Sequence, residues 1–375
     1  QALAVLTYVK LGKMEDAKRI LLVMEKMANS KDFVKYLENY GGTRSLVWWN
    51  IACQQYYLVT GDKDVINLLK LLDWKGLLSL PIGFQDGKRV VGEEGSWERE
   101  SAVEQTASMI LRLKILEKYG GDNSFGFEES GFDAAKDLED ANARLMGLAN
   151  HLCETIYIPG SRGEMYKDYV MADTYATTIQ ILTILEKDYP EAFAATNMTN
   201  FHELFKYSEG VFGTTITGSN GKTYTNLYRA GSDESLPVSF EASLQMALAY
   251  KMAAEASRAR GDSEYAEEFN QMYEAITASV FGYMKDMGYT MVPVTDRNAV
   301  LYKNGPVGYR APSMATLAQY VQIMDGSFLT ISQPNTVKTM SSVETESANK
   351  VFKYEGLGLV SFASVNKEGI SGTDK

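Results

Sequence analysis

Residues 238–250 read VSFEASLQMALAY and are apolar on nearly every face of a helix, except at Glu241 and Gln245. A helix that is apolar all round must be buried on several sides. Glu241 and Gln245 are four residues apart, so they share one face of this helix. Because an isolated buried charge is costly, Glu241 must be paired or must face a polar cavity. The stretch therefore predicts an inner helix that carries a polar site.

Similar helical periodicity recurs along the chain in pairs of segments. The connection Gly61-Asp62 combines a glycine that can end one helix with an aspartate that can cap the next, and Gly261-Asp262 is a second short connection. The expected helices cover residues 1–11, 13–29, 44–60, 63–78, 98–119, 132–153, 169–187, 199–209, 236–260, 263–283 and 311–325.

Other connections are long, notably 79–97, 154–168 and 210–237. The turn dipeptides Asp86-Gly87 and Asn220-Gly221, flanked by alternating residues, predict small β-hairpins inserted between helices. Alternating short and long connections are typical of an all-α ring of helical hairpins, with the long loops on one rim. An open α-solenoid is disfavoured, because no 34-residue period is visible and solenoid repeats seldom carry such long loops.

The pattern also predicts the domain organisation. Residues 1–325 form the helical barrel, and residues 326–375 form a tail of strands or coil with weak period-two alternation. The chain begins at Gln1, inside an apolar helical pattern with no capping residue before it, so we expect a truncated N-terminus.

Composition excludes several classes of partner. The 375 residues are 45% hydrophobic and 23% charged, which is typical of a folded chain. A net charge of −11 makes nucleic acids and anionic membrane surfaces poor partners. Apolar runs stop well before the roughly 20 residues that span a bilayer, so no membrane insertion is expected. Two cysteines do not fix the compartment, which stays open with a secreted or periplasmic location favoured.

Carboxylates at two further places are candidates for chemistry. Glu100 and Glu104 share a helical face, with Trp97 just before them. Their repulsion can keep a proton on one while the other stays ionised, the division of labour that glycoside hydrolysis uses. A solvated acidic face beside Arg112 is the alternative. Asp173 precedes another apolar helical run, where it is either a functional carboxylate or an N-cap.

We expect no metal and no cofactor. The sequence Gly221-Lys222-Thr223 matches the end of a phosphate loop, but Ile216 stands where the leading glycine is needed. The residues that could bind zinc are His151, His202, Cys53 and Cys153. His151 and Cys153 are two residues apart on one expected helix, so their side chains diverge. The sequence therefore disfavours a zinc site.

Residues 48–62 (WWNIACQQYYLVTGD) resemble the Trp, double-Tyr and Thr-Gly-Asp pattern of a helix in bacterial six-hairpin glycosidase-like proteins. Further stretches resemble the family in the same order along residues 1–325: residues 1–5, the pair Glu100 and Glu104, residues 173–176 and residues 241–250. The chain departs from the pattern at Thr177 (usually Trp), Ala102 (usually Asn) and Ala242 (usually Gly).

The resemblance implies an (α/α)6 barrel with a cleft for an oligo- or polysaccharide where the long loops gather. It further implies a glycoside hydrolase, by likeness an inverting one. The alternative is a toroid that binds glycan or protein without turnover. The candidate catalytic residues are Glu100, Glu104, Asp173 and Glu241, and the candidate substrate-binding residues are Trp48, Trp49, Trp97, Tyr166, Tyr169 and Gln245. We expect Glu241 to share a solvent-connected cavity with Trp48, Trp49 or Trp97.

Overall fold

The computed structural model divides the chain into two units, Gln1–Ser332 and Gln333–Lys375. The second unit, and with it nearly all of the predicted tail, lies outside the described residues. Within the first unit the structure describes residues 1–28, 43–71, 97–119, 134–155, 171–196, 198, 201–297, 299–300, 307–308 and 314–329.

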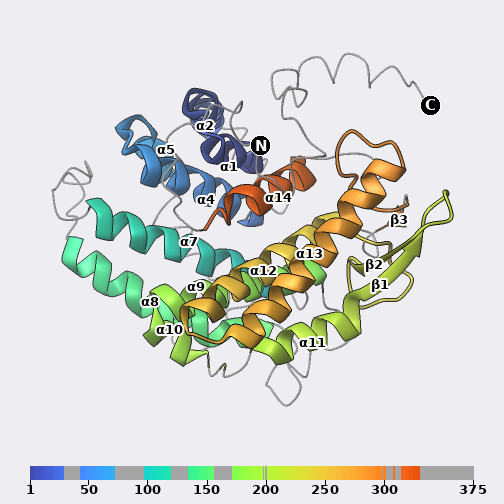
Figure 1. Cartoon of the computed structure of the whole chain (residues 1–375). Coiled ribbons are helices and arrows are strands. Elements are labelled where there is room, and N and C mark those ends of the chain that lie inside the picture. Colours follow the sequence, from blue (N-terminus) through green and yellow to red (C-terminus); the bar gives the residue numbers. More distant parts are fainter. Residues whose placement is uncertain are drawn as a thin grey trace. The chain divides into compact units, whose positions relative to one another are not determined.

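The described chain is mostly helical, as the sequence predicts, with two small two-stranded sheets (Figure 1). Predicted and observed helix bounds agree to within a few residues for most helices. The segment predicted at 63–78 is described as η1 and α5 up to Leu71, and the rest of it lies outside the described residues. Helix α10 was not predicted. The helices are α1 (Ala2–Lys10), α2 (Met14–Ala28), α4 (Thr43–Thr60), the 3-10 helix η1 (Lys63–Val65), α5 (Ile66–Leu71), α7 (Trp97–Tyr119), α8 (Ala134–Thr155), α9 (Ala172–Asp188), α10 (Pro190–Ala195), α11 (Phe201–Phe212), α12 (Phe240–Ala259), α13 (Ser263–Asp286) and α14 (Met314–Asp325).

The short connections have the predicted chemistry. Gly61 adopts a φ of +65° after α4, and the Asp62 side chain then caps η1 by accepting the Asp64 backbone N–H at 3.0 Å. Gly261 has a φ of +80°, and Asp262 caps α13 by accepting from the Tyr265 N–H at 3.3 Å. Each glycine reverses the chain direction because it tolerates the left-handed conformation.

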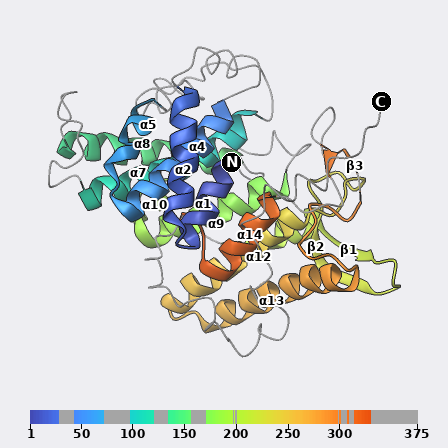
Figure 2. The same cartoon turned by 90° about the horizontal axis from the view of Figure 1, so that it is seen from above.

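Six helices contact one another in series. Helix α1 contacts α4, and the contacts continue through α7, α9, α12 and α14 back to α1. Other helices pack on members of this series: α2 on α1 and α4, α8 on α7, α11 on α9, and α13 on α12. Figure 2 shows α13 running beside α12 along much of its length. Helix α12 is buried along most of its residues, as its sequence predicts, because it contacts α9, α13 and α14.

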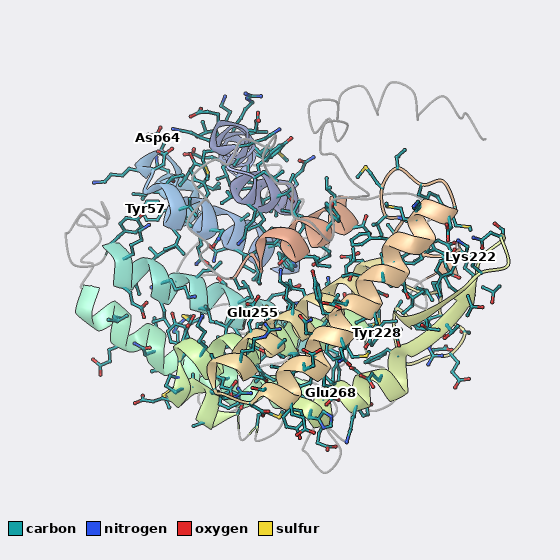
Figure 3. All side chains as sticks on the ribbon, in the orientation of Figure 1. Tyr57, Asp64, Lys222, Tyr228, Glu255 and Glu268 are labelled. Atoms are coloured by element: carbon teal, nitrogen blue, oxygen red, sulfur yellow. The ribbon has the colours of Figure 1, made fainter. Side chains whose placement is uncertain are left out.

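A β-hairpin follows α11, as the Asn220-Gly221 turn predicts. Strand β1 (Gly213–Thr217) pairs antiparallel with β2 (Thr223–Tyr228). Asp286 at the end of α13 anchors the hairpin, because it pairs with Lys222 at 2.9 Å and accepts from the Tyr224 hydroxyl at 2.8 Å (Figure 3 labels Lys222). A second pair, β3 (Ala299–Val300) and β4 (Val307–Gly308), was not predicted. The hairpin predicted in 79–97 lies outside the described residues apart from Trp97.

No helix among the described residues is both long enough and apolar enough to cross a bilayer.

Replacing Gly61 by alanine tests the tight turn after α4. An added Cβ would lie 3.2 Å from the Tyr119 hydroxyl oxygen, on a backbone that L-residues rarely adopt. We expect Gly61→Ala to lower the free energy of unfolding by about 1 to 2 kcal/mol in urea denaturation. Gly147→Ala is the matched control, because Gly147 lies inside α8 with nothing within 4 Å of an added Cβ. The control should be neutral or stabilising by up to about 1 kcal/mol. Equal stability of the two variants would contradict a tight left-handed turn at Gly61.

Candidate functional site

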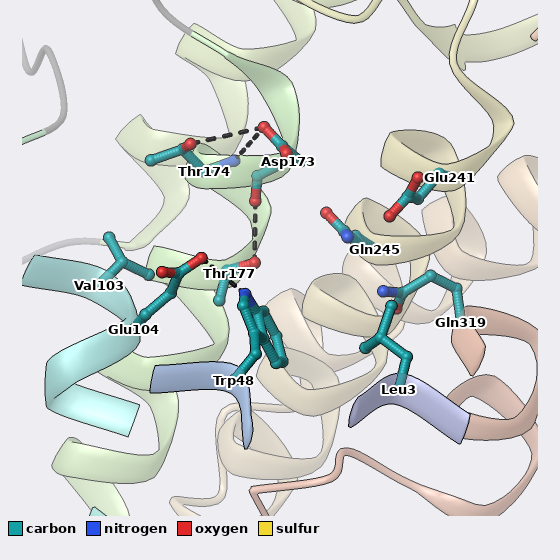
Figure 4. A pocket seen from close by; sticks show the side chains of 10 residues that line it. All are labelled: Leu3, Trp48, Val103, Glu104, Asp173, Thr174, Thr177, Glu241, Gln245 and Gln319. Carbon is teal, nitrogen blue, oxygen red and sulfur yellow. Dashed lines mark hydrogen bonds between the residues drawn. The ribbon is translucent and has the colours of Figure 1, made fainter. Parts of the chain in front are cut away.

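A cavity of about 150 Å³ lies among the six helices that contact one another in series (Figure 4). Each of these helices supplies at least one lining residue. The lining residues are Leu3 from α1, Trp48 from α4, Val103 and Glu104 from α7, Asp173, Thr174 and Thr177 from α9, Glu241 and Gln245 from α12, and Gln319 from α14. The cavity therefore draws on residues from position 3 to position 319 of the chain.

Asp173 and Glu241 reach the cavity from the first turns of α9 and α12. Neighbouring backbone ties these two helix starts together. The Ala172 N–H donates to the Ala230 carbonyl at 3.0 Å, and the Ala230 N–H donates to the Pro237 carbonyl at 3.1 Å. The positive ends of two helix dipoles are thus brought beside two carboxylates.

The start of α12 is set by its cap. Ser239 Oγ accepts the Ala242 N–H at 3.1 Å, so the helix begins at Phe240 and places Glu241 in its first turn. Ser243 strengthens this end of the helix, because its Oγ accepts the Tyr228 N–H from strand β2 at 3.0 Å. The position of the Glu241 backbone is therefore fixed from both the helix and the hairpin.

Asp173 does not cap α9, so its interpretation as an N-cap is wrong. The helix begins at Ala172, and its N-cap is Met171, which makes no side-chain cap bond. Asp173 Oδ1 instead accepts the Thr174 N–H at 2.7 Å. This bond orients a half-buried carboxylate at the cavity wall.

Glu104 is a buried carboxylate with a fixed partner. Its side chain is 4% exposed, and its Oε1 accepts the Trp48 indole N–H at 2.7 Å. Charge-assisted bonds of this length are among the stronger hydrogen bonds in proteins. The bond joins α4 to α7 and holds both side chains at the cavity.

The described lining residues include three acids and no basic side chain. Carboxylates gathered at one cavity repel one another when all are ionised. The described residues contain no group of three or more His, Cys, Asp or Glu side chains able to hold a metal ion. The three carboxylates therefore surround the cavity rather than meet at one point.

The structure brings together five of the candidate site residues: Glu104, Asp173, Glu241, Trp48 and Gln245. Glu241 and Trp48 line the same cavity, as the sequence analysis expects. Trp49 is half-buried on α4 and is not among the lining residues. Glu100 and Trp97 belong to α7, but their side chains lie outside the described part of the structure. Tyr166 and Tyr169 lie outside the described residues altogether.

Sequence reasoning missed Gln319. This amide lies in α14, within the apolar stretch ATLAQYVQIM, and its side chain is only 5% exposed. The same signal that singled out Gln245, a polar residue on an otherwise apolar helix, could have identified it. Leu3, Val103 and Thr174 carry no such signal, because apolar and hydroxyl residues are common in packed helices.

Of the four zinc-ligand candidates, Cys53 and His202 have described side chains, and neither lines the cavity; the side chains of His151 and Cys153 lie outside the described part of the structure. Burial raises the pKa of the Cys53 thiol far above its ordinary value, with Glu25 adding to the effect, so this cysteine is not a reactive thiolate. His202 contacts Glu268 at 3.0 Å (Figure 3 labels Glu268).

Comparisons of the chain with protein-family models, with curated proteins and with solved structures gave no match.

The Trp48–Glu104 bond can be tested by a double-mutant cycle of Trp48→Phe and Glu104→Gln. We expect a coupling of about 1 to 3 kcal/mol in the free energy of unfolding, because a buried carboxylate loses a hydrogen-bond donor in the first variant. A second cycle with Trp49→Phe controls for loss of an indole ring and should give a smaller coupling. Equal couplings in the two cycles would contradict a specific bond.

Proposed function

We propose that this chain is an (α/α)6 toroid that hydrolyses glycosidic bonds in an oligo- or polysaccharide. The contacts that run from α1 through α4, α7, α9, α12 and α14 back to α1 support the toroid. So do the helices that pack on single members of that series, such as α8 on α7 and α13 on α12. The resemblance of residues 48–62 and 241–250 to six-hairpin glycosidase-like proteins agrees with this arrangement.

The observation that carries the enzymatic proposal is the position of Glu104, Asp173 and Glu241 around one cavity with Trp48. Glycoside hydrolysis needs one carboxyl group that donates a proton to the leaving oxygen and one that activates water on the other face of the sugar. In the view of Figure 4, Glu104 and Glu241 lie on opposite sides of the cavity, with Asp173 between them. Such a set can bracket a sugar ring.

We assign the proton donor to Glu241 and the base to Glu104 or Asp173. Glu241 lies across the cavity from Glu104 in Figure 4, so one carboxyl group can act at the leaving oxygen while the other acts on water at the opposite face of the sugar. The Trp48 indole N–H orients Glu104, and the Thr174 N–H orients Asp173. The acid then protonates the glycosidic oxygen while the base removes a proton from the attacking water.

A non-catalytic toroid is the second candidate. Thr177 lines the cavity at the position where the resembling family has Trp, so one aromatic surface for stacking on sugar is missing there. A protein of this kind would bind a glycan or a protein in the same cavity without cleaving it.

Reducing-sugar release from a broad glycan panel tests the enzymatic proposal. We expect Glu241→Gln and at least one of Glu104→Gln and Asp173→Asn to lower kcat/KM by about 100-fold or more, because the acid and the base each move a proton. Glu255→Gln is the matched control: Glu255 is exposed on α12 (Figure 3), about 21 Å along the helix from Glu241. Equal activity in all five proteins would contradict the proposal, and binding without turnover in the wild type would favour the non-catalytic toroid.

The assignment of acid and base has its own test. A substrate with an activated aryl leaving group does not need protonation, so Glu241→Gln should retain most of its activity on aryl glycosides while Glu104→Gln or Asp173→Asn should not. Proton NMR of the first product should show inversion at the anomeric carbon, which matches carboxyl groups about 6.5 to 9.5 Å apart. Retention would contradict the inverting mechanism.

A further inference from the structure

Gln245 presents a buried hydrogen-bond acceptor to the cavity. Its side chain is 8% exposed, and its Oε1 atom has no hydrogen-bond partner among the described residues. Its backbone is held in place, because Gln180 Nε2 donates to the Gln245 carbonyl at 3.1 Å. Figure 4 shows the Gln245 amide directed into the cavity, between Asp173 and Glu241. Since buried polar atoms in proteins nearly always have partners, this oxygen points to a ligand that donates a hydrogen bond.

Gln319 presents the complementary atom. Its Oε1 accepts from Gln322 Nε2 at 2.8 Å, so its own amide nitrogen is the group left to face the cavity, as Figure 4 draws it. The cavity thus offers one amide acceptor and one amide donor. A sugar hydroxyl can satisfy both, because it donates one hydrogen bond and accepts others.

The charge at the cavity adds a second constraint on the ligand. Three carboxylates line it and none of the described lining residues is basic. A sugar carboxylate would bring a further negative charge and would accept hydrogen bonds without donating any. Its repulsion from the protein carboxylates would be only weakly screened in a partly buried site. Uncharged hydroxyls, in contrast, can donate to the carboxylates and to Gln245.

We propose that the cavity selects uncharged, hydroxyl-rich sugar units and rejects uronic acid units. The inference rests on the proposed function, because it names the substrate class of the same site. Gln245 contributes to it as the acceptor for a sugar hydroxyl, and the three carboxylates contribute by excluding anionic sugars.

Calorimetric titration of the full chain tests the selectivity. The probes are neutral oligosaccharides of glucose, mannose and galactose, and the same chains with their C6 hydroxyls oxidised to carboxylates. We expect at least one neutral chain to bind, and its oxidised counterpart to bind at least about tenfold more weakly, which corresponds to about 1.4 kcal/mol. In the double variant Glu104→Gln/Glu241→Gln the difference should narrow, because two negative charges are removed with little change in volume. Equal or tighter binding of the oxidised chain by the wild type would overturn the inference.

The role of Gln245 is tested by Gln245→Met, which removes the acceptor and keeps an unbranched side chain. We expect about a tenfold loss of affinity for the neutral chain with no change in the thermal midpoint, because Oε1 has no protein partner among the described residues. Gln271→Met, on the exposed surface of α13, should change neither quantity. A lowered midpoint with unchanged affinity would show that the amide is structural and would overturn its role.

The results separate this inference from the proposed hydrolase activity. Selective binding of a neutral chain without turnover would support the inference and overturn hydrolysis. Faster turnover of uronic acid chains than of neutral chains would support hydrolysis and overturn the inference. Absence of binding to every chain would overturn both.

Discussion

The burial of α12 is the constraint on which the site depends. This helix contacts α9, α13 and α14, and most of its side chains are buried. Polar groups are tolerated on such a helix only where they meet a partner or a cavity. Ser243 meets hydrogen-bond partners, whereas Glu241 and Gln245 meet the cavity at the end of the helix that Ser239 caps. The packing of α12 thus determines where polar chemistry can be located.

The helix starts then give the cavity its electrostatic character. The first turns of α9 and α12 bring Asp173 and Glu241 to one wall region, and α7 brings Glu104 with its partner Trp48. The Trp48 indole N–H donates to Glu104 and the Thr174 N–H donates to Asp173, and none of the described lining side chains is basic. The described lining of the cavity is therefore acidic and polar in character. The carboxylates of Asp62 and Asp64, by contrast, pair with Lys18, and these ion pairs join α2 to the turn after α4.

Sequence patterns predicted most of the described helices, because hydrophobic periodicity and Gly-Asp turns are local signals. They also singled out Glu104, Asp173 and Glu241 as candidate site residues, since a charge beside an apolar helical run is conspicuous. Gln319 was missed because its cavity-facing role depends on residues more than 70 positions away in the chain, such as Glu241 and Gln245. The capping role considered for Asp173 failed for a related reason. The start of α9 is set by the bond from Ala172 to Ala230, a distant backbone contact that no local pattern records.

The most direct test of the account is a crystal structure of the Glu241→Gln variant soaked with a neutral oligosaccharide. We expect a sugar ring inside the cavity, with its hydroxyls about 2.7 to 3.2 Å from Glu104, Asp173 or Gln245 oxygens. A sugar bound on another surface, with these side chains contacting only water, would contradict it.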